Sequence, residues 1–354
     1  MPNPRSATCP IRFPPISSSP NVAAMAQAFG TRSSGMPPVG WTNNSSPPPI
    51  ANGDHSLSKI DPKGKPLGSL FSTRNIMETF FSFLEKRVDD SSSLLCVGLD
   101  PHVSDLPSPT AAAALTFSLN LVKQTARYAA AFKPNAAFFE VFGAEGWTAL
   151  KRVIEAIREE SDRMGSRIPI ILDAKRGDIS STAEAYAKSA FESLDVDCIT
   201  LNPYLGKDSI EPFLGYKERG VFLLCKTSNA GSMDLQNLLV MPMGSDMPMP
   251  LYVYVAKLAQ QWNEKNNVGV VVGATHPQIM EMIRAAAPEL WFLAPGVGAQ
   301  GGELEITLKA GLRADGKGLL LPISRAISRA ENPGKAAAEI RDDILRIKRE
   351  LKSI

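Results

Sequence analysis

The chain has 354 residues, 44% of them hydrophobic, and its 38 basic and 36 acidic residues leave a formal net charge of +2. This near-neutral balance excludes binding to nucleic acid or to a membrane surface through bulk charge. No apolar run reaches the roughly 18 residues that a membrane span requires, so neither nucleic acid nor a membrane is expected as a partner.

The first 72 residues differ in composition from the rest. Residues 1–53 contain no Asp or Glu, and many are Pro or Ser. Such a segment cannot bury enough apolar surface to fold, so we predict a disordered extension over 1–72 and one folded domain over 73–354. The acid-poor, Ser-rich composition also leaves a targeting role open. The expected location is therefore the cytoplasm, with an organelle (plastid or mitochondrion) as the alternative.

After this extension, short apolar runs alternate with segments of helical periodicity. An amphipathic helix is predicted first, over 74–88. Eight strands are predicted after it, at 94–99, 129–133, 168–175, 197–202, 221–226, 269–273, 290–294 and 318–321. Helices are predicted at 110–128, 144–164, 182–194, 208–219, 250–266, 276–287, 302–312 and 334–351.

This alternation predicts the fold class. Strands that are apolar on both faces and alternate with amphipathic helices are typical of a parallel α/β sheet covered by helices. Eight such units predict a (β/α)8 TIM barrel with an extra N-terminal helix. A doubly wound open sheet is the alternative architecture, but no Gly-x-Gly-x-x-Gly motif follows the first strand to favour it.

The four cysteines, Cys9, Cys96, Cys198 and Cys225, form no Cys-x-x-Cys pair, and the last three lie inside predicted strands. We therefore expect buried, reduced thiols and a reducing compartment.

The third predicted strand carries the most informative motif, Ile-Leu-Asp-Ala-Lys-Arg-Gly-Asp. Asp173 and Lys175 lie two residues apart, so the alternation of side chains along a strand directs both to one face. A second carboxylate, Asp178, follows just after the strand. An ammonium group between carboxylates suits proton donation to a developing negative charge, and the motif contains neither a nucleophilic Ser, Cys or His nor a metal-ligand spacing.

Three other predicted strands also end in polar residues. The first ends in Gly-Leu-Asp-Pro, with Asp100, and the second in Phe-Lys-Pro-Asn, with Lys133. The fifth ends in Lys-Thr-Ser-Asn, residues 226–229. Because barrel enzymes place function at the carboxyl ends of their strands, these groups predict a shared site.

The last two predicted strands indicate a phosphate site. The seventh runs into Pro-Gly-Val-Gly-Ala-Gln-Gly-Gly, which includes Gln300 and Gly301, and the eighth ends in Pro-Ile-Ser-Arg, with Arg325. Glycines allow backbone N–H groups to approach an anion, and an arginine binds phosphate oxygens in bidentate fashion.

Together these motifs resemble the orotidine 5′-phosphate decarboxylase family over about residues 80–340. The motif Asp-Ala-Lys-Arg-Gly-Asp resembles that of a subgroup of the family, which is found in many bacteria and in some fusions with orotate phosphoribosyltransferase. The resemblance implies a carboxy-lyase that converts orotidine 5′-phosphate to uridine 5′-phosphate and CO2, the last step of de novo UMP synthesis, without cofactor or metal. It also implies a homodimer and a functional association with orotate phosphoribosyltransferase, although this chain shows no phosphoribosyltransferase signature.

The resemblance implies a role for each motif residue. Lys175 protonates C6 of the pyrimidine, and Asp173 lies near the substrate carboxylate. Lys133 and Asp100 hold the ribose hydroxyls, while Asp178, followed by Thr182, reaches the site of a neighbouring subunit. Ser228, with its neighbours Thr227 and Asn229, faces the base. The phosphate is bound by Gln300, Gly301 and Arg325.

Three other functions remain open. A sister decarboxylase of keto-sugar phosphates shares the Asp-x-Lys-x-x-Asp frame but uses Mg²⁺ on an acidic pair, and Lys133 would repel a metal there. A Schiff-base aldolase would need Lys175 as a neutral amine, which flanking carboxylates oppose. The third is a non-catalytic nucleotide-binding barrel.

A Met-rich segment over 232–250 follows the fifth strand and is too long for an ordinary strand–helix connection. A mobile insert near the mouth of the site and a surface loop without a role both remain open.

Overall fold

The computed structural model describes residues 78–297 and 301–352, with side chains over 303–351 in the second range. The predicted extension over 1–72, its boundary at residue 73 and the start of the predicted first helix therefore lie outside the described residues.

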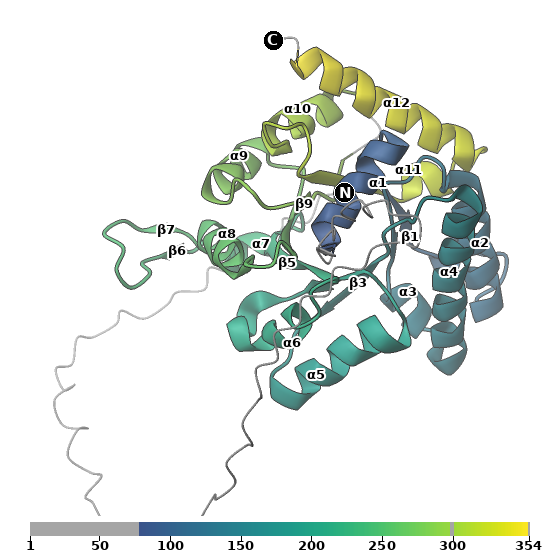
Figure 1. Ribbon diagram of the computed structural model, residues 1–354, viewed down its shortest axis with the longest axis horizontal. Helices are drawn as coiled ribbons and strands as arrows, with labels where there is room; N and C mark the ends of the chain where they lie inside the picture. The colour runs from purple at the N-terminus through teal and green to yellow at the C-terminus, as the bar shows by residue number, and fades with distance from the viewer. Residues whose placement is uncertain (1–77, 298–300, 353–354) are drawn as a thin grey trace, which may run out of the picture. The chain divides into compact units, whose positions relative to one another are not determined.

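Eight parallel strands form the centre of the fold (Figure 1). They are joined in the order β2-β1-β10-β9-β8-β5-β4-β3, and single bridges Phe132–Ile170 and Asn135–Asp173 connect β2 to β3. The sheet thus closes on itself, which confirms the TIM barrel and excludes the open doubly wound sheet. The strands are β1 Leu95–Leu99, β2 Ala131–Pro134, β3 Ile171–Arg176, β4 Cys198–Leu201, β5 Gly220–Lys226, β8 Val268–Val272, β9 Phe292–Leu293 and β10 Leu319–Ile323.

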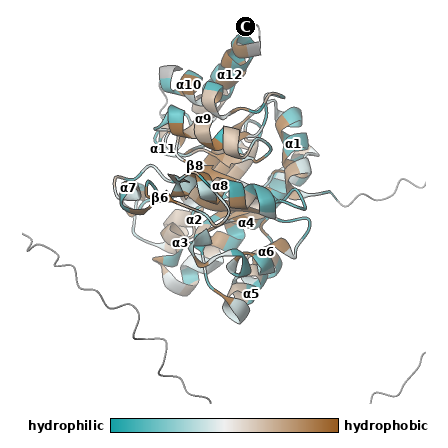
Figure 2. Ribbon diagram, turned by 90° about the vertical axis from the view of Figure 1, so that its left-hand side faces the viewer, coloured by the Kyte–Doolittle hydropathy of each residue, from teal (hydrophilic) through white to brown (hydrophobic). Residues whose placement is uncertain are grey.

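Helices surround the barrel, and Figure 2 shows hydrophobic colour around β8 with hydrophilic turns on outer helices such as α5. Because each strand contacts side chains on both of its faces, most strand residues are buried. The longer helices are α1 Phe80–Ser91, α2 Ala111–Thr125, α4 Gly143–Met164, α5 Ser180–Lys188, α8 Leu251–Trp262, α9 Pro277–Ala286, α10 Gly301–Gly311 and α12 Pro333–Lys352. The short ones are α3 Ala137–Glu140, α6 Glu211–Leu214, α7 Ser232–Leu235 and α11 Arg325–Ser328.

Most predicted helices are confirmed, but the helix predicted over 208–219 is wrong. Two 3-10 turns, Pro203–Leu205 and Lys207–Ser209, precede the four-residue helix α6. Pro212 lacks the N–H that a continuous helix from residue 208 would use, and Gly215 follows directly at the C-cap.

The helix α1 covers the amino-terminal end of the barrel. Phe80 packs on the backbone of Gly220, where an added Cβ would lie 2.3 Å from the phenyl ring. Phe81 stacks on Trp291 at a centroid distance of 6.1 Å, and Arg87 donates to the carbonyls of Ala126 and Ala129. The extra N-terminal helix is therefore a plug for the end of the barrel opposite the predicted site.

The Met-rich segment leaves the barrel as a hairpin, β6 Leu239–Val240 and β7 Met249–Pro250, which projects away from the strands in Figure 1. Several of its apolar side chains are exposed, Met243 completely.

Cys96, Cys198 and Cys225 are free and buried, as expected from their places in predicted strands. Burial raises the pKa of each thiol. Among the described helices, none has the length and apolar character needed to cross a membrane.

Candidate active site

The carboxyl ends of β2 and β3 bring three charged side chains into contact. Asp173 Oδ2 accepts a hydrogen bond from Lys133 Nζ at 2.8 Å, and its Oδ1 accepts one from Lys175 Nζ at 2.5 Å. Asp173 and Lys133 are 9% and 7% exposed, whereas the side chain of Lys175 is 50% exposed. The array therefore consists of a buried lysine, a buried carboxylate and a second lysine that reaches solvent.

A bulge in β3, rather than a regular pleat, produces this contact. Between the pairs Leu172–Ile199 and Arg176–Leu201, β3 advances four residues while β4 advances two. Thr200 of β4 fills the irregularity: its hydroxyl accepts the N–H groups of Ala174 and Lys175 at 3.1 and 2.9 Å. The same hydroxyl donates to Asp173 Oδ1 at 3.1 Å.

Thr200 is a site residue that the sequence interpretation missed. It is 1% exposed and lies in an otherwise apolar strand, Cys-Ile-Thr-Leu. A single hydroxyl in the middle of a buried strand requires polar partners. The isolated threonine in an apolar strand is therefore the sequence signal that could have identified Thr200.

Lys175 adopts a left-handed backbone conformation, with φ of 48°. Residues other than glycine rarely occupy this region, and such strain typically costs about 1–3 kcal/mol. The surrounding hydrogen bonds, particularly those of Thr200, hold the lysine in a conformation that directs its ammonium group to Asp173.

The charges of the array stabilise one another. Burial alone would raise the pKa of Asp173, but Lys133 and Lys175 outweigh it and hold that pKa well below its usual range. Burial alone would lower the pKa of Lys133, but the carboxylates of Asp173 and Asp100 raise it above the ordinary lysine value. Both groups are therefore charged throughout the physiological pH range.

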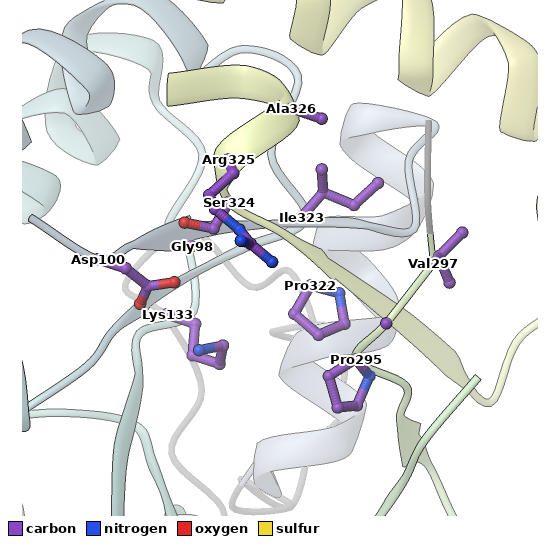
Figure 3. Close-up of a pocket in the computed structure, with 11 residues that line it drawn as sticks. Gly98, Asp100, Lys133, Pro295, Val297, Pro322, Ile323, Ser324, Arg325 and Ala326 are labelled. Carbon is purple, nitrogen blue, oxygen red and sulfur yellow. The ribbon is translucent and has the colours of Figure 1, made fainter. Parts of the chain in front are cut away.

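A cavity of about 360 Å³ opens beside the array. Figure 3 shows Asp100 and Lys133 on one side, Pro295 and Val297 on the other, and Ser324 and Arg325 at the end of β10. The cavity therefore joins the predicted ribose-binding residues to the predicted phosphate-binding arginine.

Two buried oxygen atoms at this cavity, Asp100 Oδ1 and Ser324 Oγ, have no partner among the described residues. Both side chains lie against Gly98, where an added Cβ would come within 2.8 Å of Ser324 Cβ and 3.4 Å of Asp100 Oδ2. A buried oxygen without a partner is costly, so a polar ligand in the cavity would satisfy both. Ser324 is a second residue that the sequence interpretation did not assign.

The predicted phosphate residues are only partly described. Arg325 is exposed at the cavity and pairs with no carboxylate within the described part of the chain. Gly301 begins α10, and its backbone lies directly after the loop of β9. Gln300 lies outside the described residues, so its predicted role stays a prediction.

The structure distinguishes the three polar residues after β5. Thr227 Oγ1 accepts from Gln236 Nε2 at 2.9 Å and donates to Asn229 Oδ1 at 2.6 Å. Ser228 instead lies against the neighbouring strand ends: an added Cβ on Gly273 would be 3.1 Å from Ser228 Cβ, and one on Gly296 3.9 Å from Ser228 Oγ. Of the three residues, Ser228 is therefore the one packed against the ends of β8 and β9.

Asp178 and Thr182 do not join the array of their own chain. In the described structure, Asp178 accepts one hydrogen bond, from the N–H of Ile179 at 2.8 Å. Thr182 is exposed in the first turn of α5.

A barrel whose mouth combines a lysine–carboxylate array with a cavity ending at an arginine defines an enzyme that acts on an anionic small molecule by acid–base chemistry. Among the described residues, no group of three or more His, Cys, Asp or Glu side chains could hold a metal ion.

Comparisons with known proteins identify the family. Residues 93–340 match the model of the orotidine 5′-phosphate decarboxylase / HUMPS family. A Roseiflexus sp. (strain RS-1) protein named orotidine 5′-phosphate decarboxylase is 46% identical over 260 residues, which cover 72% of this chain and 91% of that protein. The chain belongs to the orotidine 5′-phosphate decarboxylase / HUMPS family.

Similar solved structures support the same family assignment. The Leishmania donovani OMP decarboxylase is 49% identical with a TM-score of 0.67, and the match covers 76% of this chain and 98% of that one. The Leishmania donovani UMP synthase is 52% identical with a TM-score of 0.68, and the match covers 76% of this chain but 56% of that one.

Proposed function

We propose that the chain decarboxylates orotidine 5′-phosphate to uridine 5′-phosphate and CO2, as a cofactor-free carboxy-lyase in UMP synthesis. The observation that carries this proposal is the Lys133–Asp173–Lys175 array beside a cavity that ends at Arg325. The names of the matched relatives support the same activity.

Asp173 provides electrostatic repulsion. A substrate carboxylate about 4 Å from Asp173 would experience roughly 4 kcal/mol of repulsion at an effective dielectric constant near 20. This repulsion corresponds to about three powers of ten in rate. Loss of CO2 relieves it, but the carbanion left on a ring carbon needs further stabilisation.

Lys175 provides that stabilisation. Its ammonium group is the exposed end of the array, and the bulge and Thr200 fix its position before substrate binds. A preorganised positive charge stabilises the transition state without reorganisation, and the same group donates the proton to C6 as CO2 leaves.

The other residues hold the remainder of the nucleotide. Asp100 and Lys133 line the cavity and would hold the ribose hydroxyls, and Arg325 at its far end would bind the phosphate. Gln300 and Gly301, which follow β9 in the sequence, are proposed as further phosphate ligands. Binding energy from a remote phosphate can be used to position the reacting carboxylate against Asp173.

The keto-sugar-phosphate decarboxylases of the same superfamily are the second candidate, since the matched family model includes the HUMPS group. A metal-dependent reaction would need acidic ligands near Asp173. Lys133 Nζ instead lies 2.8 Å from that carboxylate and would repel a divalent cation. The nucleotide reaction is therefore favoured.

An ultraviolet absorbance assay tests the proposal. We expect the purified full chain to convert orotidine 5′-phosphate to uridine 5′-phosphate at the same rate with and without a chelator. Turnover of a keto-sugar phosphate that depends on Mg²⁺, with none of orotidine 5′-phosphate, would refute it.

We further propose that the working unit is a homodimer. Exposed apolar side chains follow four consecutive strands, β1 to β4, on one side of the barrel mouth: Val103, Val141, Ile179, Tyr204 and Leu205. Clusters of this kind mark interaction surfaces. Among the described residues, Asp178 forms no hydrogen bond or ion pair with Lys175 and accepts one only from the N–H of Ile179, so this carboxylate is available to a neighbouring site.

Mixing two inactive variants tests the dimer. Lys175→Ala and Asp178→Ala protomers should together regenerate activity, because a mixed dimer has one site with both residues intact. Random pairing at equal amounts gives at most about one working site in four. Mixtures that stay inactive after verified subunit exchange would place Asp178 in its own chain's site.

Two further proposals concern the cellular context. The longer UMP synthase relative supports a functional association with orotate phosphoribosyltransferase, which co-purification would test. We propose that the protein is located in the cytoplasm. Imaging of a fluorescent protein fused to residues 1–72 tests this, because accumulation in an organelle would show that the segment is a targeting signal.

A further inference from the structure

Lys226, the last residue of β5, is a buried lysine without a carboxylate partner. It is 2% exposed, and among the described residues it forms no ion pair with an Asp or Glu. Its Nζ donates to Ser232 Oγ at 2.9 Å and to Asn237 Oδ1 at 3.0 Å, and it lies 5.9 Å from the ring centroid of Tyr252. Neutral groups alone therefore solvate this cation.

Both hydrogen-bond acceptors belong to the segment between β5 and α8; residues 229–251, which end at the first residue of α8, are here called the connection. The same connection is tied a second time beside β5, to Thr227, the residue after the strand: Gln236 Oε1 accepts the N–H of Thr227 at 2.9 Å, and Gln236 Nε2 donates to Thr227 Oγ1. Its far end returns to these anchors, since the N–H of Tyr252 donates to the carbonyl of Gln236 at 3.2 Å.

Ser228 directly follows these two anchored residues. The carbonyl of Lys226 accepts the N–H of Gly273 at 2.7 Å, which fixes the strand end against β8. Ser228 then lies between Gly273 and Gly296 at the mouth of the barrel. Its position depends on the backbone of 226–227, and hence on whether the connection stays in place.

We propose that Lys226 is a positioning residue for the decarboxylation: its buried ammonium group holds the 229–251 connection on the end of β5 and thereby places Ser228 against the pyrimidine base. If the connection moves away, the ammonium group loses both of these hydrogen bonds. Hydrogen bonds from a charged donor are stronger than those between neutral groups, so the two bonds favour the docked connection. This inference rests on the proposed function.

The Lys226→Met variant tests it, because methionine keeps the apolar stem and removes the charge. Since Ser228 would contact the base in substrate and transition state alike, its misplacement should appear in KM. We expect KM to rise about tenfold with kcat within about threefold of the parent. The affinity for uridine 5′-phosphate should fall by the same factor, and hydrogen exchange should accelerate in peptides from 229–251.

Lys265→Met is the matched control. Lys265 Nζ also donates a hydrogen bond, to the carbonyl of Leu214 at 3.0 Å, but it precedes β8 at the opposite end of the barrel. This variant should retain the parental KM and product affinity.

The outcomes separate the two proposals. An inactive parent refutes the proposed function. An active parent whose Lys226→Met variant retains parental KM and product affinity overturns the role of Lys226, as does a fall in kcat alone. If Lys226→Met does not fold, the double variant Ser232→Ala/Asn237→Ala decides: a raised KM supports the inference, and a parental KM overturns it.

Discussion

Two buried carboxylates, Asp173 and Asp197, lie at opposite ends of the same barrel, and each is surrounded by cations. Asp197 is 1% exposed, lies just before β4, and is paired with Arg158 at 2.9 Å, Arg219 at 3.4 Å and Arg167. It also accepts the backbone N–H of Ile170 at 2.9 Å. Asp173 is paired instead with lysines.

The difference between arginine and lysine explains the difference in role. A guanidinium group stays charged, and its fork of donors holds several oxygens at once: Arg158 and Arg219 also bind the carbonyls of Asp195 and Val196. The cluster around Asp197 therefore fastens strands and loops. A lysine carries a point charge and a transferable proton, which suits the array around Asp173 to chemistry.

Lys175→Ala should produce the largest effect. Removal of the proton donor should lower kcat by several powers of ten, above the roughly 10²–10⁴ typical of general acid–base catalysis, because the variant also loses the preorganised charge. Calorimetry should show a Tm close to the parental value, since the lysine removed is half-exposed and Lys133 still pairs with Asp173. A variant that kept more than about a tenth of the activity would refute the assignment.

Asp197→Ala should have the opposite profile. Removing one partner from a buried charge cluster costs about 3–5 kcal/mol, so Tm should fall by about 10 °C or more. Below the transition, kcat should stay near the parental value. Asp343→Ala, which removes a carboxylate from an exposed pair with Arg346 on α12, is the control and should leave Tm near the parental value.

Arg325→Ala should have an intermediate effect confined to activity. Loss of a bidentate phosphate contact should raise KM by about 10–100-fold, and kcat should fall as well if phosphate binding positions the substrate. Steady-state kinetics with orotidine 5′-phosphate decide the outcome, and a parental kcat/KM would exclude a phosphate contact.

Acid unfolding should show the smallest effect. Because Lys133 and Lys175 depress the pKa of Asp173, its ionisation stabilises the fold above its unfolded-state pKa of about 3.9. That contribution is lost as pH falls through the folded-state pKa. Below about pH 4, the unfolding free energy of the parent should fall more steeply than that of Asp173→Asn, by up to about 1.4 kcal/mol per pH unit. Identical slopes would contradict the charged array.

The barrel could be predicted from the sequence because each strand and each helix has its own local pattern of apolar residues. Any parallel α/β sheet covered by helices requires these patterns to alternate along the chain. The helix over 208–219 failed because Pro212 and Gly215 override the hydrophobic pattern. Asp173 and Lys175 were predicted to share one face of a regular strand, and the structure brings them into contact. The bulge that produces it could not be predicted, because it depends on a hydroxyl from the adjacent strand, Thr200.

By itself, the sequence determined the order of the elements and the positions of acids and lysines at strand ends, since both follow from residue type and spacing along the chain. The tertiary structure decided which residues meet. It joined Lys133 to Asp173 across 40 positions, separated Ser228 from Thr227, and enclosed Lys226 within the connection that follows it. Such contacts arise when the sheet closes and side chains compete for space and hydrogen-bond partners, and no local pattern records that competition.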